Sequence, residues 1–110
     1  MVSEGELEEM ILAKLEPTTR FCADLGNMLE VRAGDATAKT RILKMVDHVR
    51  REASAFAVRV EAAGPFATAS DVEQVMRREF DAVALAKAGV LDMLELFLDR
   101  GALVDRVERV

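Results

Sequence analysis

The chain has 110 residues with a net charge of −5, and 51% of its residues are hydrophobic. This length is typical of one domain, here residues 1–110, and the abundant apolar residues exclude a disordered chain. The single cysteine excludes an internal disulfide, and the absence of Trp and Tyr beside many Ala, Leu, Glu, Arg and Met residues favours a helical protein.

The first predicted helix begins near Ser3, which has the spacing of a capping box with Glu6. Apolar residues follow at alternating steps of four and three, as the buried side of a helix requires. They are Ile11, Leu15, Thr18, Cys22, Leu25 and Leu29. Pro17 lies inside this pattern, and a proline within a helix removes a backbone hydrogen bond and displaces the preceding turn. The sequence therefore predicts either one helix kinked near Pro17 or two helices that meet there and line the same core.

A second helix is predicted from about Thr37 to Ala63, after Gly34 and Asp35 have ended the first and begun the next. Its apolar positions again form a heptad pattern. They are Ile42, Val46, Val49, Ala53, Phe56, Val60 and Ala63. Gly64–Pro65 is expected to end this helix, which would be about 40 Å long.

A third helix is predicted near Ser70 and Glu73, which have the spacing of a second capping box. Its apolar stripe keeps the same alternation of steps. The residues of this stripe are Val72, Met76, Glu79, Val83, Ala86, Val90, Met93 and Phe97. Gly101 is expected to end the helix, and residues 103–110 would add a short amphipathic helix.

Helices of this length must lie side by side, and short connections make neighbouring helices antiparallel. No alternating strand pattern interrupts them. The predicted fold is therefore all-α. It is an elongated antiparallel up-down bundle of three long helices, or of four if Pro17 breaks the first, with a short C-terminal helix.

The ends and the most apolar stretch of the chain bear on its location. The first ten residues, MVSEGELEEM, are acidic where a secretory signal would be basic. Residues 90–98 are interrupted by Asp92 and Glu95 and are too short to span a bilayer. We therefore expect a soluble cytoplasmic protein without membrane contacts.

Basic residues concentrate between residues 37 and 60. They are Lys39, Arg41, Lys44, Arg50, Arg51 and Arg59. The simpler interpretation is that this basic helix lies beside the acidic helices of the same fold, and the alternative is a basic face for an acidic partner. Nucleic acid is not an expected partner, because no stacking aromatic residues accompany these basic side chains.

His48 is the only histidine of the chain. Because Val46 and Val49 lie on the apolar stripe, His48 is expected on the exposed side of its helix, together with Arg51. It has no second histidine to form a metal site, and Met45 stands where the Glu-x-x-His motif of di-iron bundles needs a glutamate. No cofactor is therefore expected.

The residues that follow His48 resemble the phosphorylated-histidine motif of histidine-phosphotransfer domains, which are helical bundles of similar size. The stretch reads His48-Val49-Arg50-Arg51-Glu52-Ala53-Ser54-Ala55. The family motif runs His-x-Leu-Lys-Gly and continues with small residues, so the resemblance places Arg51 at the lysine and Ser54 among the small residues. Arg50 replaces the leucine, and Glu52 replaces a glycine that allows close approach of the partner, where its carboxylate would repel a phosphoryl group. The resemblance implies a phosphotransfer protein that uses His48 and Arg51 as one alternative function.

A cluster of acids suggests a second alternative. Asp92, Glu95 and Asp99 are three and four residues apart and so share one stripe of a helix. They could hold Mg²⁺ with ligands from another helix, as in bundle-type nucleotide pyrophosphohydrolases, whose Glu-x-x-Glu spacing recurs at Glu6 and Glu9. Compensation of the helix dipole already explains acids in a first helical turn, and a solvated stripe explains the others. The Mg²⁺ enzyme is therefore the third hypothesis.

The segment VLDMLELFL, residues 90–98, is apolar around most of its helical circumference. A helix in a three-helix bundle needs only a stripe toward its neighbours. Either the N-terminal helix and the C-terminal tail cover the additional apolar side chains, or these side chains contact another protein chain. The candidate binding residues for such a contact are Leu91, Leu94 and Leu98.

The first functional hypothesis follows from this surface. It is a non-enzymatic helical interaction module, a small subunit or adaptor that forms a homo-oligomer or docks a protein partner through its last long helix. Cys22, which falls on an apolar stripe, is expected to be a buried hydrophobic residue rather than a reactive thiol.

Overall fold

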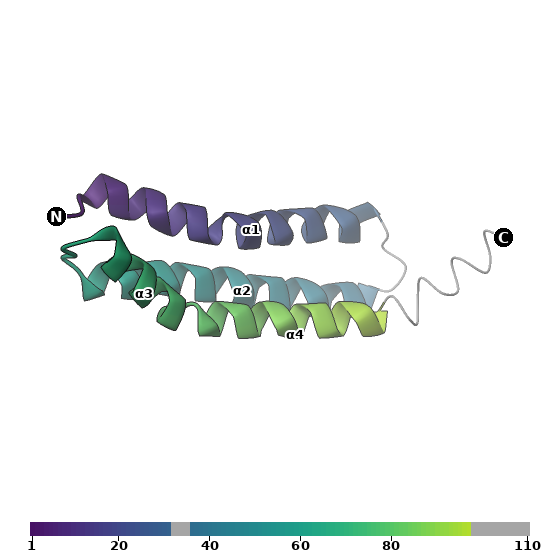
Figure 1. The fold of residues 1–110 in the computed structure, drawn as a ribbon. Helices are drawn as coiled ribbons and strands as arrows, with labels where there is room; N and C mark the ends of the chain where they lie inside the picture. Colours follow the sequence, from purple (N-terminus) through teal and green to yellow (C-terminus); the bar gives the residue numbers. More distant parts are fainter. Residues whose placement is uncertain (32–35, 98–110) are drawn as a thin grey trace.

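The structure is a computed structural model and describes residues 1–31 and 36–97. These residues form four helices, α1 (Glu4–Val31), α2 (Ala36–Ala63), α3 (Ala69–Glu79) and α4 (Asp81–Phe97), and no strand. Figure 1 shows α1 and α2 side by side in opposite directions, with α3 and α4 running back along α2. The predicted all-α bundle is confirmed. None of the helices in the described ranges combines the length and the hydropathy of a membrane-spanning segment.

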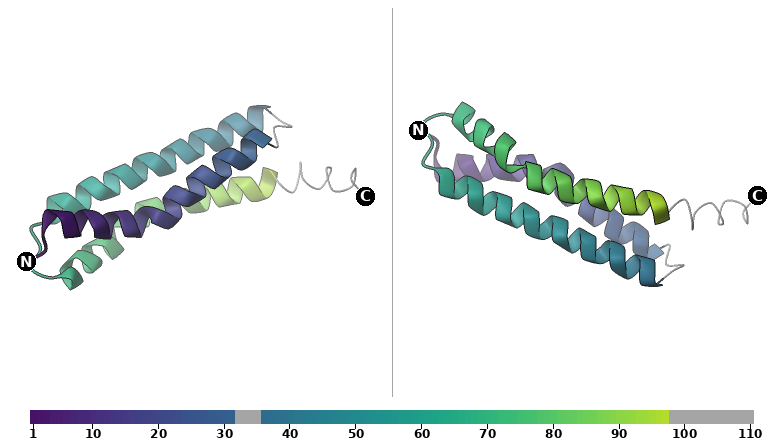
Figure 2. Two further views of the ribbon diagram at one scale, coloured as in Figure 1. Left: turned by 90° about the horizontal axis from the view of Figure 1, so that it is seen from above. Right: turned by 90° about the horizontal axis from the view of Figure 1, so that it is seen from below.

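The first helix is continuous through Pro17. Its start is fixed by Ser3, whose Oγ accepts a hydrogen bond from the backbone N–H of Glu6 at 3.1 Å. Figure 2 shows that α1 bends along its length, as expected for a helix with an internal proline. The predicted kink therefore describes α1, and the alternative of two separate helices is wrong.

The second helix ends at Ala63, and Gly64–Pro65 follow it as predicted. A β-carbon on Gly64 would lie 3.2 Å from the ring of Phe66, so the chain passes close to this buried ring as it turns. The carbonyl of Phe66 accepts a hydrogen bond from the N–H of Val2 at 3.0 Å, which ties the start of the chain to the turn after α2.

The prediction of one long third helix is wrong, because the helix is interrupted at Phe80, between α3 and α4. The predicted capping box is also wrong. Thr68, with extended backbone angles, is the N-cap, and its Oγ1 accepts from the N–H of Asp71 at 3.2 Å. The Asp71 carboxylate accepts in return from the N–H of Thr68 at 3.2 Å. Ser70 therefore lies inside the first turn of α3.

Two clusters of buried side chains hold the bundle together. The first consists of Ile11, Leu15, Phe56, Val60, Phe66, Val72, Met76 and Val83. The second consists of Cys22, Leu25, Leu29, Ile42, Val46, Val49 and Val90. Both clusters draw on α1, α2 and α4, whereas α3 contributes only to the first.

The predicted apolar stripes supply most of these residues. All six stripe residues of α1 are buried, Thr18 included. Ala63 is exposed, which contradicts its assignment to the α2 stripe, and Glu79 is half-buried and forms an ion pair with Arg59. The predictions for Gly34, Asp35, Gly101 and residues 103–110 lie outside the described residues.

Candidate interaction surface on α4

The helix α4 buries one side and exposes another that is also largely apolar. Val83 and Val90 are fully buried, whereas 76% of Leu85, 47% of Leu91 and 54% of Leu96 are exposed. Small apolar residues lie between these leucines on the exposed side. They are Ala82, Ala84 and Ala88. A helix that exposes several leucines and alanines is a candidate surface for another protein chain.

The leucines proposed from the sequence have different environments. Leu91 is exposed, Leu94 is half-buried and packs against the second core cluster, and Leu98 lies outside the described residues. Leu85 and Leu96 are more exposed than Leu91 and were missed as candidates. The signal that could have found them is their separation of eleven residues, or three helical turns, off the apolar stripe.

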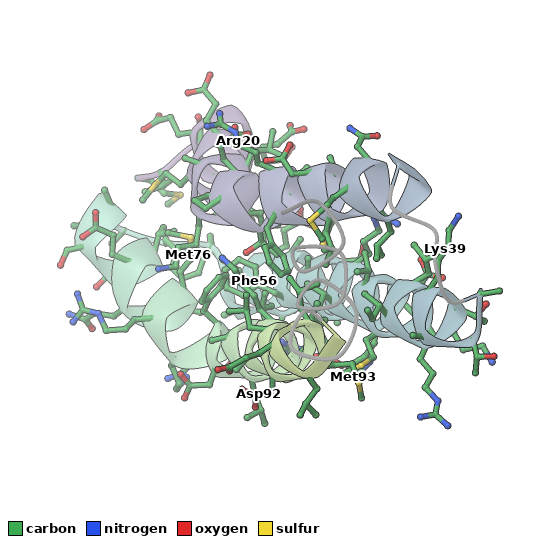
Figure 3. The ribbon with its side chains drawn as sticks, turned by 90° about the vertical axis from the view of Figure 1, so that its right-hand side faces the viewer. Arg20, Lys39, Phe56, Met76, Asp92 and Met93 are labelled. Atoms are coloured by element: carbon green, nitrogen blue, oxygen red, sulfur yellow. The ribbon has the colours of Figure 1, made fainter. Side chains whose placement is uncertain are left out.

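The charges exposed on α4 are all negative. Asp81, Asp92 and Glu95 are exposed, and in Figure 3 Asp92 projects from the side of α4 that points away from α1. The only cation of this helix, Lys87, is half-buried, and its Nζ lies 5.1 Å from the ring centroid of Phe21 on α1. The exposed side of α4 thus combines apolar and acidic side chains.

The junction between α3 and α4 sets the position of this surface. Arg59 of α2 donates from Nε to the carboxylate of Glu79 at 3.0 Å and from Nη2 to the backbone carbonyl of Glu79 at 3.2 Å. The ring of Phe80 packs edge-on against Phe56, with centroids 5.4 Å apart and an interplanar angle of 83°. The Nζ of Lys14 on α1 lies 4.7 Å from the same Phe80 ring. Side chains from α1 and α2 therefore hold the point where α4 begins.

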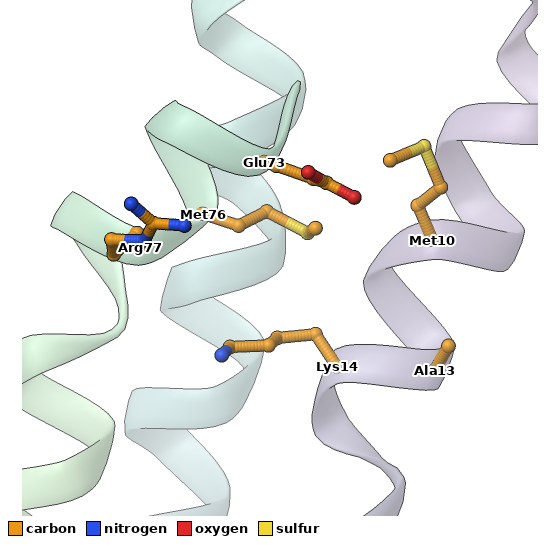
Figure 4. Close-up of a pocket in the computed structure, with 6 residues that line it drawn as sticks. All are labelled: Met10, Ala13, Lys14, Glu73, Met76 and Arg77. Carbon is orange, nitrogen blue, oxygen red and sulfur yellow. The ribbon is translucent and has the colours of Figure 1, made fainter. Parts of the chain in front are cut away.

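Among the surface grooves elsewhere on the bundle are two that border α1. One, of about 520 Å³, lies between α1 and α3, where Lys14 and Met76 project toward each other's helix (Figure 4). Its lining residues are Met10, Ala13, Lys14, Glu73, Met76 and Arg77. The other, of about 460 Å³, lies between α1 and α2 and contains Cys22. Neither groove brings together an acid, a base and a nucleophile in the manner of a catalytic site.

Cys22 is buried, as the sequence predicts, with 2% of its surface exposed. Burial raises the pKa of the Cys22 thiol above its ordinary value of 9.0, and the positive charges of Arg50 and Lys87 act in the opposite direction. The thiol is therefore protonated at neutral pH and is not a nucleophile there.

His48 lies on the exposed side of α2, as the sequence predicts, and Arg51 is exposed one turn further on. Glu52 is half-buried, and Asp47 forms an ion pair with Arg50 at 3.4 Å. The position of His48 leaves its ring accessible to another protein. The phosphotransfer role of His48 and Arg51 stays a prediction.

The described acids that were proposed as metal ligands lie at opposite ends of the bundle. Asp92 and Glu95 are exposed near the C-terminal end of α4, and Asp99 lies outside the described residues. Glu6 and Glu9 lie in the first turns of α1, at the opposite end of the bundle in Figure 1. In the described ranges, no three or more His, Cys, Asp or Glu side chains are grouped so that they could hold a metal ion.

The exposed side of α4 is thus the candidate surface that the geometry supports best. Its exposed leucines are not among the described residues that form the two core clusters or pack against them. Comparison with known proteins adds no functional assignment, because no protein-family model, no curated protein and no solved structure matches the chain.

Proposed function

We propose that the protein is a non-enzymatic helical interaction module that docks a helix of another chain, either a partner or a second copy, on the exposed side of α4. The observation that carries the proposal is the exposure of Leu85, Leu91 and Leu96 on one helix. Burying a fully exposed leucine contributes about 1.5–3 kcal/mol, so covering Leu85 and Leu96, which share one side of α4, would contribute roughly 2–4 kcal/mol. That is a useful fraction of the free energy of a protein–protein contact.

The folded chain does not need these leucines for its own core. The buried side of α4 already supplies Val83 and Val90 to the two clusters. Leu85 and Leu96 on the opposite side, and Leu91 on a flank, expose large apolar side chains that reduce solubility without stabilising the bundle. Docking of a second helix is the use that this arrangement favours, with leucines as anchors and acids beside them.

A photo-crosslinking experiment tests the docking proposal. Ala88→p-benzoylphenylalanine places a crosslinker among the exposed leucines of α4, and Leu12→p-benzoylphenylalanine places one on α1, where Leu12 is 59% exposed. We expect an adduct of defined mass from position 88 in cells and no such adduct from position 12.

The adduct must also depend on the leucines. Leu85→Asp with Leu96→Asp should abolish it, whereas Leu12→Asp should leave it unchanged, and circular dichroism should show the same helicity in all variants. Equal crosslinking from both positions, or an adduct that survives the two aspartates, would contradict docking on α4.

Exposure of His48 supports a second candidate function, transfer of a phosphoryl group through its imidazole. Incubation of the full chain with a phosphorylated receiver domain should then give an acid-labile phosphoprotein that His48→Gln abolishes. A wild-type chain that never becomes labelled rules this function out.

A further inference from the structure

The side of the bundle that faces away from α1 is formed by α2 and α4, which lie side by side in front of α1 in the right-hand view of Figure 2. Two contacts identify the edge of α2 that faces α3 and α4. A β-carbon on Gly89 would lie 3.6 Å from Cε of Met45, and Arg59 binds Glu79.

Arg41 and His48 lie beside this edge of α2. Arg41 is four residues before Met45, and His48 is three residues after it. Residues three or four apart share one side of a helix, so both lie on the same side as Met45. Both are exposed. They therefore form the outer surface of α2 next to α4.

Gly89 marks the corresponding edge of α4. Leu85, Asp92 and Leu96 stand four before, three after and seven after Gly89, so they occupy the same side of this helix. All three are exposed. We call the surface made of Arg41 and His48 of α2 with Leu85, Asp92 and Leu96 of α4 the α2–α4 face.

The charges on this face and beside it occupy matching heights along the bundle. The two helices are antiparallel, and Met45 lies level with Gly89. Arg41 is four residues before Met45, and Met93 is four residues after Gly89. In antiparallel helices these two residues lie at the same height, so Arg41 is level with Met93 and next to Asp92. Arg51 is six residues after Met45, and Val83 is six residues before Gly89. Arg51 is therefore level with Val83 and near Asp81. Each of these two arginines on α2 thus has an acid of α4 at nearly its own height.

Two copies can pair through this face about a two-fold axis in two ways. An axis across the helices would place α4 on the partner's α4, and pairing two helices whose exposed charges are all negative is unfavourable. With an axis parallel to the helices, each residue of the partner lies at the same height along the bundle as in the first copy, and α4 lies on the partner's α2. Arg41 then lies opposite the partner's Asp92, and the leucines of both copies meet near the axis. Of the two, the second arrangement is the one that places Arg41 against an acid.

We infer that the chain docks with a second copy of itself through the α2–α4 face, with α4 of each copy on α2 of the other. The inference rests on the proposed docking function of α4 and names its partner. It also gives a use to the exposed basic residues of α2, because Arg41 and Arg51 supply the positive charges that the acidic α4 lacks.

Charge reversal tests the pairing. In a dimer of Arg41→Asp, both symmetry-related contacts place acid against acid, and in a dimer of Asp92→Arg both place arginine against arginine. Each variant alone should dimerise about tenfold more weakly than wild type at low salt. An equimolar mixture of the two variants makes both contacts complementary again and should restore wild-type association. Sedimentation equilibrium over a dilution series measures all three.

The control is Arg77→Asp, the same charge change at an exposed arginine of α3 that lies in the groove of Figure 4. It should leave dimerisation unchanged. If Asp92→Arg weakens dimerisation and Arg41→Asp does not, the arrangement of α4 on α2 is overturned. It is also overturned if the equimolar mixture of the two variants does not regain wild-type association.

The experiments distinguish failure of self-pairing from failure of docking on α4. If the wild-type chain stays monomeric at every concentration while position 88 still crosslinks to a different protein, self-pairing is overturned and docking on α4 stands. If the chain is monomeric and position 88 crosslinks to nothing, both are overturned.

Discussion

Arg59 binds both the side chain and the backbone of Glu79, with 3.0 Å from Nε to the carboxylate and 3.2 Å from Nη2 to the carbonyl oxygen. The carbonyl of Glu79 would ordinarily accept from the N–H of Val83 in a continuous helix. The guanidinium of Arg59 supplies a donor to this carbonyl where α3 gives way to α4. One side chain of α2 thus stabilises the interruption of a helix that it faces.

Arg59→Ala should lower the free energy of unfolding by about 1–2 kcal/mol, because it removes two hydrogen bonds from half-buried partners. Urea denaturation measures the change. Arg78→Ala is the matched control, since Arg78 contacts the same carboxylate at 3.4 Å but is 69% exposed. Its effect should stay below about 0.5 kcal/mol. Equal losses from the two variants would mean that the carbonyl contact contributes nothing.

Thr68→Ala should destabilise the protein by about 1 kcal/mol, because the hydroxyl of Thr68 caps α3. Ser70→Ala, two residues further on and inside the helix, should have a smaller effect or none. Thermal denaturation of the two variants distinguishes the two capping assignments. A larger loss from Ser70→Ala would favour the capping box expected from the sequence.

Gly89→Ala should stabilise the protein by about 0.5–1 kcal/mol, since alanine costs less backbone entropy than glycine in a helix. The new methyl group would lie 3.6 Å from Met45, an ordinary van der Waals distance. Gly26→Ala, whose new methyl group would meet no atom from another part of the protein within 4 Å, should stabilise α1 similarly. Gly64→Ala is the contrast, because its β-carbon would lie 3.2 Å from the Phe66 ring, and it should bring no gain in denaturation midpoint.

The buried thiol of Cys22 makes stability depend on alkaline pH. Burial raises the pKa of Cys22 in the folded chain above the ordinary 9.0, so the folded state holds its proton more tightly than the unfolded state. The resulting stabilisation is complete below pH 9 and is lost as pH rises through the folded-state pKa. The free energy of unfolding of wild type should therefore fall relative to that of Cys22→Ala above this pH. Parallel pH profiles for the two proteins would contradict the prediction.

The apolar stripes of α1 and α2 could be predicted from the sequence because each repeats regularly over several turns. The same regularity concealed the interruption at Phe80, since the spacing from Val72 and Met76 to Val83 fits one continuous helix. The hydrogen bond from Arg59 is a tertiary contact that no local pattern reveals. The choice of cap was similarly ambiguous, because Thr68 and Ser70 each have an acid three residues later.

The candidate surface on α4 could be predicted only in part from the sequence. Leu91 could be predicted as a candidate because it lies in an apolar segment, and it is exposed. Leu85 stands alone between alanines, so no run of large apolar residues marks it. Its exposure depends on the rotation of α4 about its axis, which the contacts of Phe80 and Gly89 set.

The division of the core into two clusters has a consequence for local unfolding. Because α3 contributes only to the first cluster, it can detach without exposing the second, in which Leu25, Val46 and Val90 stay packed. Local opening of this kind is detected by amide hydrogen exchange, and α3 should exchange at a lower free energy than the middle of α2. We therefore expect the α3 end of the bundle to open separately from the end that the second cluster holds.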